Sequence, residues 1–195
     1  PPAPLAGGLV IAFESATFAI GRGAVTDGNG GYRMSVPPGR YILAFIDPAG
    51  NHRPEFFNDK LDPTTITQAD FVPVARRQTA TANALLTPVN NTPPLNPATL
   101  SGTITKPGGA AVAGGWAIAI AADGSVRAAV ANASGQYSIT GLAGGDVRVE
   151  FVDPSGANMA EFFDNKATFA GADLVRTTLG LTTTVNAALA DDPRF

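Results

Sequence analysis

The chain has 195 residues, 13 of them basic and 16 acidic, and its net charge of −3 is unsuited to neutralising a run of phosphates, so no nucleic-acid partner is expected. With no Cys and a single His, the sequence offers no disulfide framework and no zinc–thiolate site, and we expect a non-enzymatic protein with no catalytic residue, metal site or cofactor. Its 22 Gly and 16 Pro, beside 45% hydrophobic residues, favour short strands joined by turns.

In chain order, the sequence contains two copies of one unit. Four segments of the first copy recur in the second: PLAGGLVIAF at 4–13 as AVAGGWAIAI at 111–120, VTDGNGGYRMSV from 25 as VANASGQYSIT from 130, GRYILAFIDPAG from 39 as GDVRVEFVDPSG from 145, and EFFNDK at 55–60 as EFFDNK at 161–166. The last pair, called the EFF segments below, is the most alike. Because the order is kept throughout, we interpret the chain as a tandem duplication.

Within each copy the apolar residues alternate with polar ones. In GDVRVEFVD, for example, Val147, Val149 and Phe151 alternate with Arg148 and Glu150, which is typical of a strand with one buried and one solvated face. The segments DGNGG and NASGQ supply residues that tolerate positive φ between two strands, as hairpins need. Each copy therefore predicts six or seven short strands, and the fold class is all-β: two tandem prealbumin-like, Ig-like Greek-key sandwiches.

The predicted domain boundaries follow from composition. Residues 1–87 form the first sandwich, residues 88–99 a Pro- and Asn-rich linker, residues 100–190 the second sandwich and residues 191–195 a C-terminal tail. The longest uncharged stretch near the apolar maximum, residues 107–122, contains four glycines and is too short for a bilayer, so no membrane span is expected. A chain that begins at Pro1 without a leader is expected to be a processed form or a fragment.

The order of motifs in the second copy carries a family resemblance. A Gly-rich turn is followed by SGQYSI from Ser134, GLAGGDV from Gly141 and a closing VNAAL strand. This order resembles the carboxypeptidase regulatory-like and Cna-B-type domains of the prealbumin-like group. The resemblance implies a structural or binding module of a secreted or cell-surface bacterial protein.

Some Cna-B-type domains carry an internal Lys–Asn isopeptide bond beside a buried acid. The resemblance places Lys106 and Asn186 on the corresponding strands and Glu150 near them. Alternation, however, puts Asn186 opposite Val185 and Ala187, and it puts Glu150 opposite its apolar neighbours, so we do not expect this bond. The first copy has no equivalent Lys.

The EFF segments are the candidate binding site. Two adjacent aromatic residues cannot face the same side of a strand, so one ring of each pair should enter the core. The other rings either form a platform for a glycan or a partner protein, with polar contacts from the turn, or pack beneath a loop. The candidate binding residues are Phe56, Phe57, Asn58, Asp59, Phe162, Phe163, Asp164 and Asn165.

Oxygen-bearing residues also collect in the turns, as Asp27, Asn29, Asp47 and Asp153 illustrate. Their spacing does not match a calcium-binding loop, and turns favour these residues for backbone reasons, so we predict no metal site. His52 has no counterpart in the second copy and no clustered ligands, which predicts an ordinary surface residue.

The first copy lacks one predicted strand. The second copy opens with LSGTITKPGG at 100–109 before its AVAGG segment, whereas only Pro1 to Ala3 precede the matching PLAGG segment. An open sheet edge and an apolar groove are therefore expected at the first copy. Either the edge stays open in a truncated chain, or a strand from another molecule completes the sheet, which would make the chain a self-associating subunit of a filament.

From these observations, we predict an extracellular or cell-surface structural module that acts as a stalk, a spacer or a subunit of a surface assembly. The alternative is an adhesin that binds a glycan or a protein through its EFF loops. Buried phenylalanine rings would favour the structural interpretation.

Overall fold

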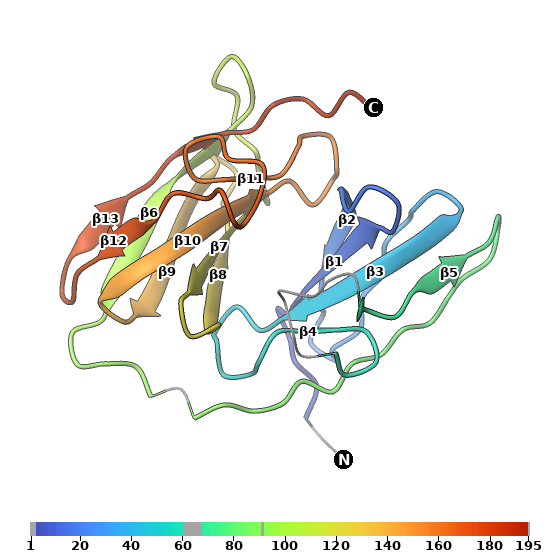
Figure 1. Cartoon of the computed structure of the whole chain (residues 1–195), viewed down its shortest axis with the longest axis horizontal. Helices are drawn as coiled ribbons and strands as arrows, with labels where there is room; N and C mark the ends of the chain where they lie inside the picture. The colour runs from blue at the N-terminus through green and yellow to red at the C-terminus, as the bar shows by residue number, and fades with distance from the viewer. Residues whose placement is uncertain (1–2, 61–67, 91, 195) are drawn as a thin grey trace. The chain divides into compact units, whose positions relative to one another are not determined.

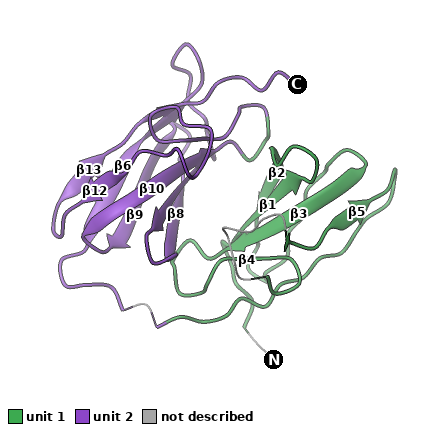
Figure 2. Ribbon diagram, viewed as in Figure 1, with its two compact units in different colours: residues 1–89, 154–156 green, residues 90–153, 157–195 purple. Residues whose placement is uncertain are grey.

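The computed structural model describes residues 3–60, 68–90 and 92–194, and these residues form strands, turns and loops (Figure 1). The all-β fold class is confirmed. The chain divides into two compact units, Pro1–Val89 with Pro154–Gly156 and Asn90–Asp153 with Ala157–Phe195 (Figure 2). No helix in the part of the chain that the structure describes is long and apolar enough to cross a bilayer.

Unit 2 contains two sheets. The first has the order β11-β10-β7-β8, with β12 paired to β10, and the second has the order β13-β6-β14, with β9 paired to β6. The strands are β6 (Ala98–Thr105), β7 (Trp116–Ala121), β8 (Val126–Val130), β9 (Gln136–Leu142), β10 (Gly145–Val152), β11 (Glu161–Phe162), β12 (Val175–Thr177), β13 (Thr182–Thr184) and β14 (Ala187–Ala188).

The core of unit 2 lies between its two sheets, as the alternation predicts. Val147, Val149 and Phe151 of β10 face inward and meet Leu100 and Ile104 of β6 in one cluster of buried side chains. Two opposed sheets whose inward faces interdigitate are the defining arrangement of a β-sandwich.

Strand β6 organises the second sheet of unit 2. It pairs antiparallel with β9 and parallel with both β13 and β14, so each of these three strands is hydrogen-bonded to β6. Within the described residues, no pairing joins β9, β13 or β14 to any other strand. The second sheet therefore depends on this single central strand.

Unit 1 contains one sheet among its described residues. Its order is β2-β1-β3-β4, with β5 paired to β3. The strands are β1 (Leu9–Glu14), β2 (Ile20–Val25), β3 (Gly39–Ile46), β4 (Glu55–Phe56) and β5 (Val72–Val74). This sheet corresponds to the first sheet of unit 2, because β1, β3 and β4 carry the segments that match β7, β10 and β11.

The second layer of unit 1 has no strands in the described part of the chain. Residues 31–37 and 79–86, which correspond to β9 and to the β13–β14 region, run without a ladder partner. Backbone N–H and C=O groups need partners to form a sheet, and no strand among the described residues pairs with either segment. The described residues of unit 1 thus form five strands where six or seven were expected, because residues 31–37 and 79–86 have no strand between them to pair with.

The predicted linker and the predicted tail are both hydrogen-bonded to the compact units. Val89 donates its N–H to the carbonyl of Asn51 at 2.8 Å, and β6 already begins at Ala98. At the other end of the chain, Asp192 donates its N–H to the carbonyl of Ala157 at 2.9 Å. Isolated bridges therefore include Pro88 and Asp191 of the two expected segments, and Ala98 and Thr99 belong to β6.

Candidate functional site

The two EFF segments form the same tight turn. Phe56 and Lys60 exchange backbone hydrogen bonds of 2.7 and 3.2 Å, and Phe162 and Lys166 exchange bonds of 2.7 and 3.1 Å. The two residues at the tip of each turn have positive φ: 69° and 57° for Asn58 and Asp59, and 61° and 57° for Asp164 and Asn165. Asn and Asp tolerate this conformation better than most residues, so the turn itself accounts for these four side chains.

The aromatic rings of the EFF segments pack within their own units. Phe56 and Phe162 are 7% and 9% exposed, and Phe162 makes an edge contact with Phe169 at 6.0 Å between ring centroids. Phe57 and Phe163 are partly buried against the apolar cores of units 1 and 2. None of the four rings forms an open platform of the kind that the adhesin interpretation needs.

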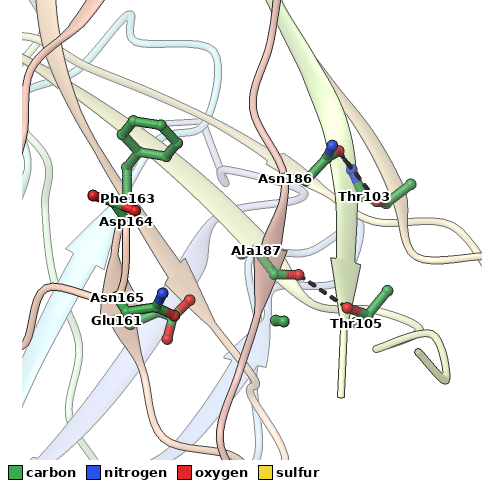
Figure 3. Close-up of a pocket in the computed structure, with 9 residues that line it drawn as sticks. Thr103, Thr105, Glu161, Phe163, Asp164, Asn165, Asn186 and Ala187 are labelled. Carbon is green, nitrogen blue, oxygen red and sulfur yellow. Dashed lines mark hydrogen bonds between the residues drawn. The ribbon is translucent and has the colours of Figure 1, made fainter. Parts of the chain in front are cut away.

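A pocket of about 310 Å³ lies beside the second EFF turn (Figure 3). One wall carries Glu161, Phe163, Asp164 and Asn165, and the other is formed by β6 and the closing segment of unit 2. Three of the eight predicted binding residues thus line one pocket. Phe162 does not line this pocket, because β11 directs its ring to the other side.

Each EFF segment begins with a glutamate that binds the closing segment of its unit. Glu161 accepts a hydrogen bond from the N–H of Ala188, and Glu55 accepts one from Leu85. Burial raises the pKa of Glu161 above its ordinary value and outweighs the effect of that hydrogen bond. Burial is also the largest cause of the raised pKa of Glu55, with repulsion from Asp59 next. These glutamates were missed by the sequence analysis, although each directly precedes the two phenylalanines.

The side chain of Asn186 is exposed and already engaged. Its Oδ1 accepts hydrogen bonds from the N–H and the Oγ1 of Thr103, at 3.0 and 3.2 Å (Figure 3). The amide therefore ties the closing segment to the edge of β6, as a solvent-facing polar residue would. Its neighbours Val185 and Ala187 are buried, so Asn186 faces away from the core as the alternation predicts.

The acidic side chains in the turns accept hydrogen bonds from nearby groups. Asp27 accepts hydrogen bonds from the N–H groups of Asn29 and Gly31, at 2.8 and 2.9 Å. Asp47 is 3% exposed, and its Oδ2 lies 2.7 Å from Nδ1 of His52, whose side chain is 30% exposed. Among residues 3–60, 68–90 and 92–194, no three His, Cys, Asp or Glu side chains are grouped as a metal ion would need.

Unit 1 contains an open groove of about 1470 Å³. Its floor is the inner face of the sheet, with Val10, Leu43 and Phe45, and its walls are residues 32–36 and 79–86. In unit 2 the equivalent walls are β9 and β13–β14, and β6 lies between them. The groove, called the open groove below, therefore occupies the position that β6 fills in unit 2.

The two walls of the open groove are joined by the same hydrogen bond that joins their counterparts in unit 2. Tyr137 donates its hydroxyl to the carbonyl of Val185 at 2.6 Å, and Tyr32 does the same to Ala82 at 2.8 Å. Tyr32 and Ala82 are the counterparts of Tyr137 and Val185 in the duplication. The two walls are thus held as they are in unit 2, although no strand of the described residues lies between them.

The side chains of the open groove are less buried than their counterparts. Ala187 and Leu189 are 8% and 0% exposed, whereas Ala84 is exposed and Leu86 is only partly buried. Tyr32 is likewise partly buried where Tyr137 is 4% exposed. These positions lack the cover that β6 provides in unit 2. The sequence predicted an apolar groove here but did not identify Tyr32, Ala82 or Asn83 as its walls.

Comparison with known proteins gives distant structural matches. No protein-family model matches the chain, and no curated protein sequence is similar to it. The resemblance to the carboxypeptidase regulatory-like and Cna-B-type families therefore stays a prediction.

Three solved structures illustrate the matches. The chain is 13% identical to GBS52, the minor pilin of Streptococcus agalactiae. The match covers 98% of this chain and 85% of GBS52, with a TM-score of 0.35. It is 13% identical to the TIE protein of Bacillus anthracis, with a TM-score of 0.36. That match covers 96% of this chain and 31% of the TIE structure, so the chain spans about a third of that structure. For the shaft pilin SpaA of Lactobacillus rhamnosus GG, the identity is 7%, the coverage 96% and 88%, and the TM-score 0.32. All three similarities are distant.

Proposed function

We propose that this protein is a non-enzymatic structural module of an extracellular surface assembly, in which unit 1 is a docking point for another polypeptide. The observation that carries the proposal is the open groove of about 1470 Å³ between the two unpaired walls of unit 1. An apolar sheet face with unpaired backbone on both sides is an unfavourable surface for a protein that acts alone. It is a favourable surface for one that is completed by a neighbour.

The packing of the EFF segments supports the same proposal. Their rings lie within the units, and their polar residues occupy positions of positive φ that the turn requires. A stalk or a subunit needs rigid turns of this kind, whereas a carbohydrate platform needs exposed aromatic faces. The lack of Cys and the Gly- and Thr-rich strands are compatible with an extracellular address.

Sedimentation velocity over a range of protein concentrations, with negative-stain electron microscopy, tests the assembly function. We expect the chain to associate as its concentration rises, and Ala84→Arg to abolish the association. Ala84 is exposed in the open groove, so the charged side chain is compatible with folding but not with a covering strand. Ala133→Arg, in an exposed turn of unit 2, is the matched control. A chain that stays monomeric at all concentrations would contradict self-assembly.

The adhesin remains the second candidate, because a pocket of about 310 Å³ adjoins Asp164 and Asn165. A glycan array probed with the wild-type chain and with Asn165→Gly separates the two functions. Glycine keeps the positive φ of the turn and removes the amide. Binding that the wild type shows and this variant loses, with unchanged thermal stability, would favour the adhesin.

A further inference from the structure

We propose that the open groove binds an extended strand with the side-chain pattern of β6 and an acidic flank on its N-terminal side. This inference rests on the proposed function, because it names the chemistry of the neighbour that completes unit 1. The partner is a polypeptide segment with a large aliphatic residue, a glycine two positions later and a second large aliphatic residue two positions after that.

The pattern is taken from the strand that fills the same position in unit 2. Leu100 and Ile104 of β6 are fully buried and face the core beside Tyr137 and Phe151. The corresponding ring pair in unit 1, Tyr32 and Phe45, is present in the same edge-to-face arrangement, with centroids 6.0 Å apart compared with 5.9 Å in unit 2. Two aliphatic side chains spaced four residues apart on a bound strand would thus pack against Tyr32 and Phe45 as Leu100 and Ile104 pack against the rings of unit 2.

Glycine is required at the centre of the strand because the backbones approach closely there. A Cβ placed on Gly102 would overlap the carbonyl oxygen of Val185, the group to which Tyr137 donates its hydroxyl. In unit 1 the equivalent carbonyl is that of Ala82, which Tyr32 holds in the same way. A strand that enters the open groove therefore needs glycine at the position facing Ala82.

The walls of the open groove also provide free hydrogen-bonding groups in the right places. In unit 2, Val185 and Leu189 donate their N–H groups to the carbonyls of Ser101 and Thr105 on β6, at 2.8 and 2.9 Å. Their counterparts, the N–H groups of Ala82 and Leu86, have no hydrogen-bond partner among the residues described for unit 1.

The side chain of Asn83 completes this set. Asn186, its counterpart, accepts hydrogen bonds from the N–H and the hydroxyl of Thr103 on β6. Asn83 is exposed and makes no such bond to any other part of the chain that the structure describes. We therefore expect a residue with a hydroxyl next to the glycine, and a strand that runs parallel to residues 82–86 and antiparallel to residues 32–36.

The positive charge of the residues that line the open groove favours acidic residues beside the partner strand. Arg33, Arg76 and Arg77 line the open groove, and no Asp or Glu lies among the described residues that line it. Arg77 has φ 60° and corresponds to Gly180, which donates its N–H at 2.7 Å to Asn96, two residues before β6 begins. The arginine side chain is thus placed beside the segment that leads into the bound strand, where a carboxylate would be favoured.

Fluorescence anisotropy with labelled synthetic peptides tests the proposal on the full chain. The probe is ATLSGTIT, the sequence of residues 98–105, preceded by Asp-Asp in one peptide and by Lys-Lys in a matched one. We expect the Asp-Asp peptide to bind more tightly, by a margin that shrinks as salt is added. We expect a Gly→Val change in the peptide to weaken binding about tenfold or more, the usual range for forced overpacking.

Protein variants locate the binding. Ala84→Arg should abolish binding of the Asp-Asp peptide and Ala133→Arg should leave it unchanged. Asn83→Ala should weaken binding severalfold, whereas Asn186→Ala, the matched change in the filled unit, should have no effect. In amide hydrogen exchange, Ala82 and Leu86 should become protected on peptide addition, and Leu85, which is already bonded to Glu55, should change little.

The outcomes separate this inference from the proposed function. If the chain assembles and Ala84→Arg blocks assembly, but no peptide binds or the Gly→Val peptide binds equally well, the strand chemistry proposed here is wrong and the assembly function stands. If the Asp-Asp peptide binds as described but the chain never self-associates, the partner is a different protein. In that case the inference stands and self-assembly is wrong.

Discussion

The hydroxyl of Tyr32 donates a hydrogen bond of 2.8 Å to the carbonyl oxygen of Ala82, 50 residues further along the chain. The same bond joins Tyr137 to Val185 in the second copy. In unit 2 this bond lies beside β6, and in unit 1 it joins two segments between which the described part of the chain places no strand. The tyrosine therefore sets the position of the closing segment independently of the central strand.

Removing the two hydroxyls should have unequal effects. Tyr137→Phe leaves a buried carbonyl without its donor and should lower the free energy of unfolding of unit 2 by about 1 to 2 kcal/mol. Urea unfolding followed by the fluorescence of Trp116, the single Trp, which lies in β7, reports on unit 2. Tyr32→Phe should leave this transition in place, and equal shifts for both variants would contradict the assignment.

Gly102→Ala should destabilise unit 2, because the added methyl group overlaps the Val185 carbonyl and the backbones must separate. Overpacking of this kind costs about 1 to 3 kcal/mol. The matched control is Gly144→Ala, where the nearest atom to a Cβ is 3.4 Å away, an ordinary contact. Thermal unfolding of the two variants, followed by Trp116 fluorescence, gives the comparison. A Gly102→Ala protein as stable as the control would mean that β6 does not approach the closing segment so closely.

Substitutions at the tip of the second EFF turn should follow backbone conformation. Asn165 has φ 57°, so Asn165→Gly should leave stability unchanged or raise it. Asn165→Val places a β-branched residue in the left-handed region and should cost about 1 to 2 kcal/mol. Chemical denaturation of both variants checks this prediction. If the glycine variant were the less stable of the two, the amide would have a role beyond the turn.

The stability of unit 2 should depend on the ionisation of Glu161. Its pKa is raised by burial, so the folded state favours the protonated form. The resulting stabilisation is fully present below the ordinary glutamate value of 4.5 and is lost as the pH rises through the raised pKa. Glu161→Gln keeps an acceptor for the N–H of Ala188 without the charge. It should therefore be more stable than the wild type at neutral pH and equal to it in acid.

A carboxylate with the opposite shift provides the control for this experiment. Hydrogen bonds from Ser125 lower the pKa of Asp123, so its contribution is present above the ordinary value of 3.8 and is lost as the pH falls through the lowered pKa. Asp123→Asn should thus be less stable than the wild type at neutral pH. Thermal unfolding across a pH series measures both variants. A Glu161→Gln protein whose stability parallels that of Asp123→Asn would contradict the effect of burial on Glu161.

Much of the fold follows from local sequence. The alternation in GDVRVEFVD places Val147, Val149 and Phe151 in the core, because successive side chains of a strand point to opposite faces. The paired polar residues of the EFF segments indicate a turn, because Asn and Asp tolerate positive φ. The tandem duplication is also visible in the sequence, and a comparison of its two copies predicts an open edge at the first.

Only the tertiary structure decided which segments of unit 1 form the walls of the open groove. The residues that bond to β6 come from distant parts of the chain, as Thr103 and Asn186, 83 positions apart, illustrate. A single sequence does not specify such pairings, because each strand takes its hydrogen-bond partners from segments that only folding brings near. For that reason the segment DGNGG predicts a turn between two strands, whereas residues 32–36, which follow it, form no ladder among the described residues. The sequence determines which face turns inward, and the presence of a neighbour determines whether a ladder forms.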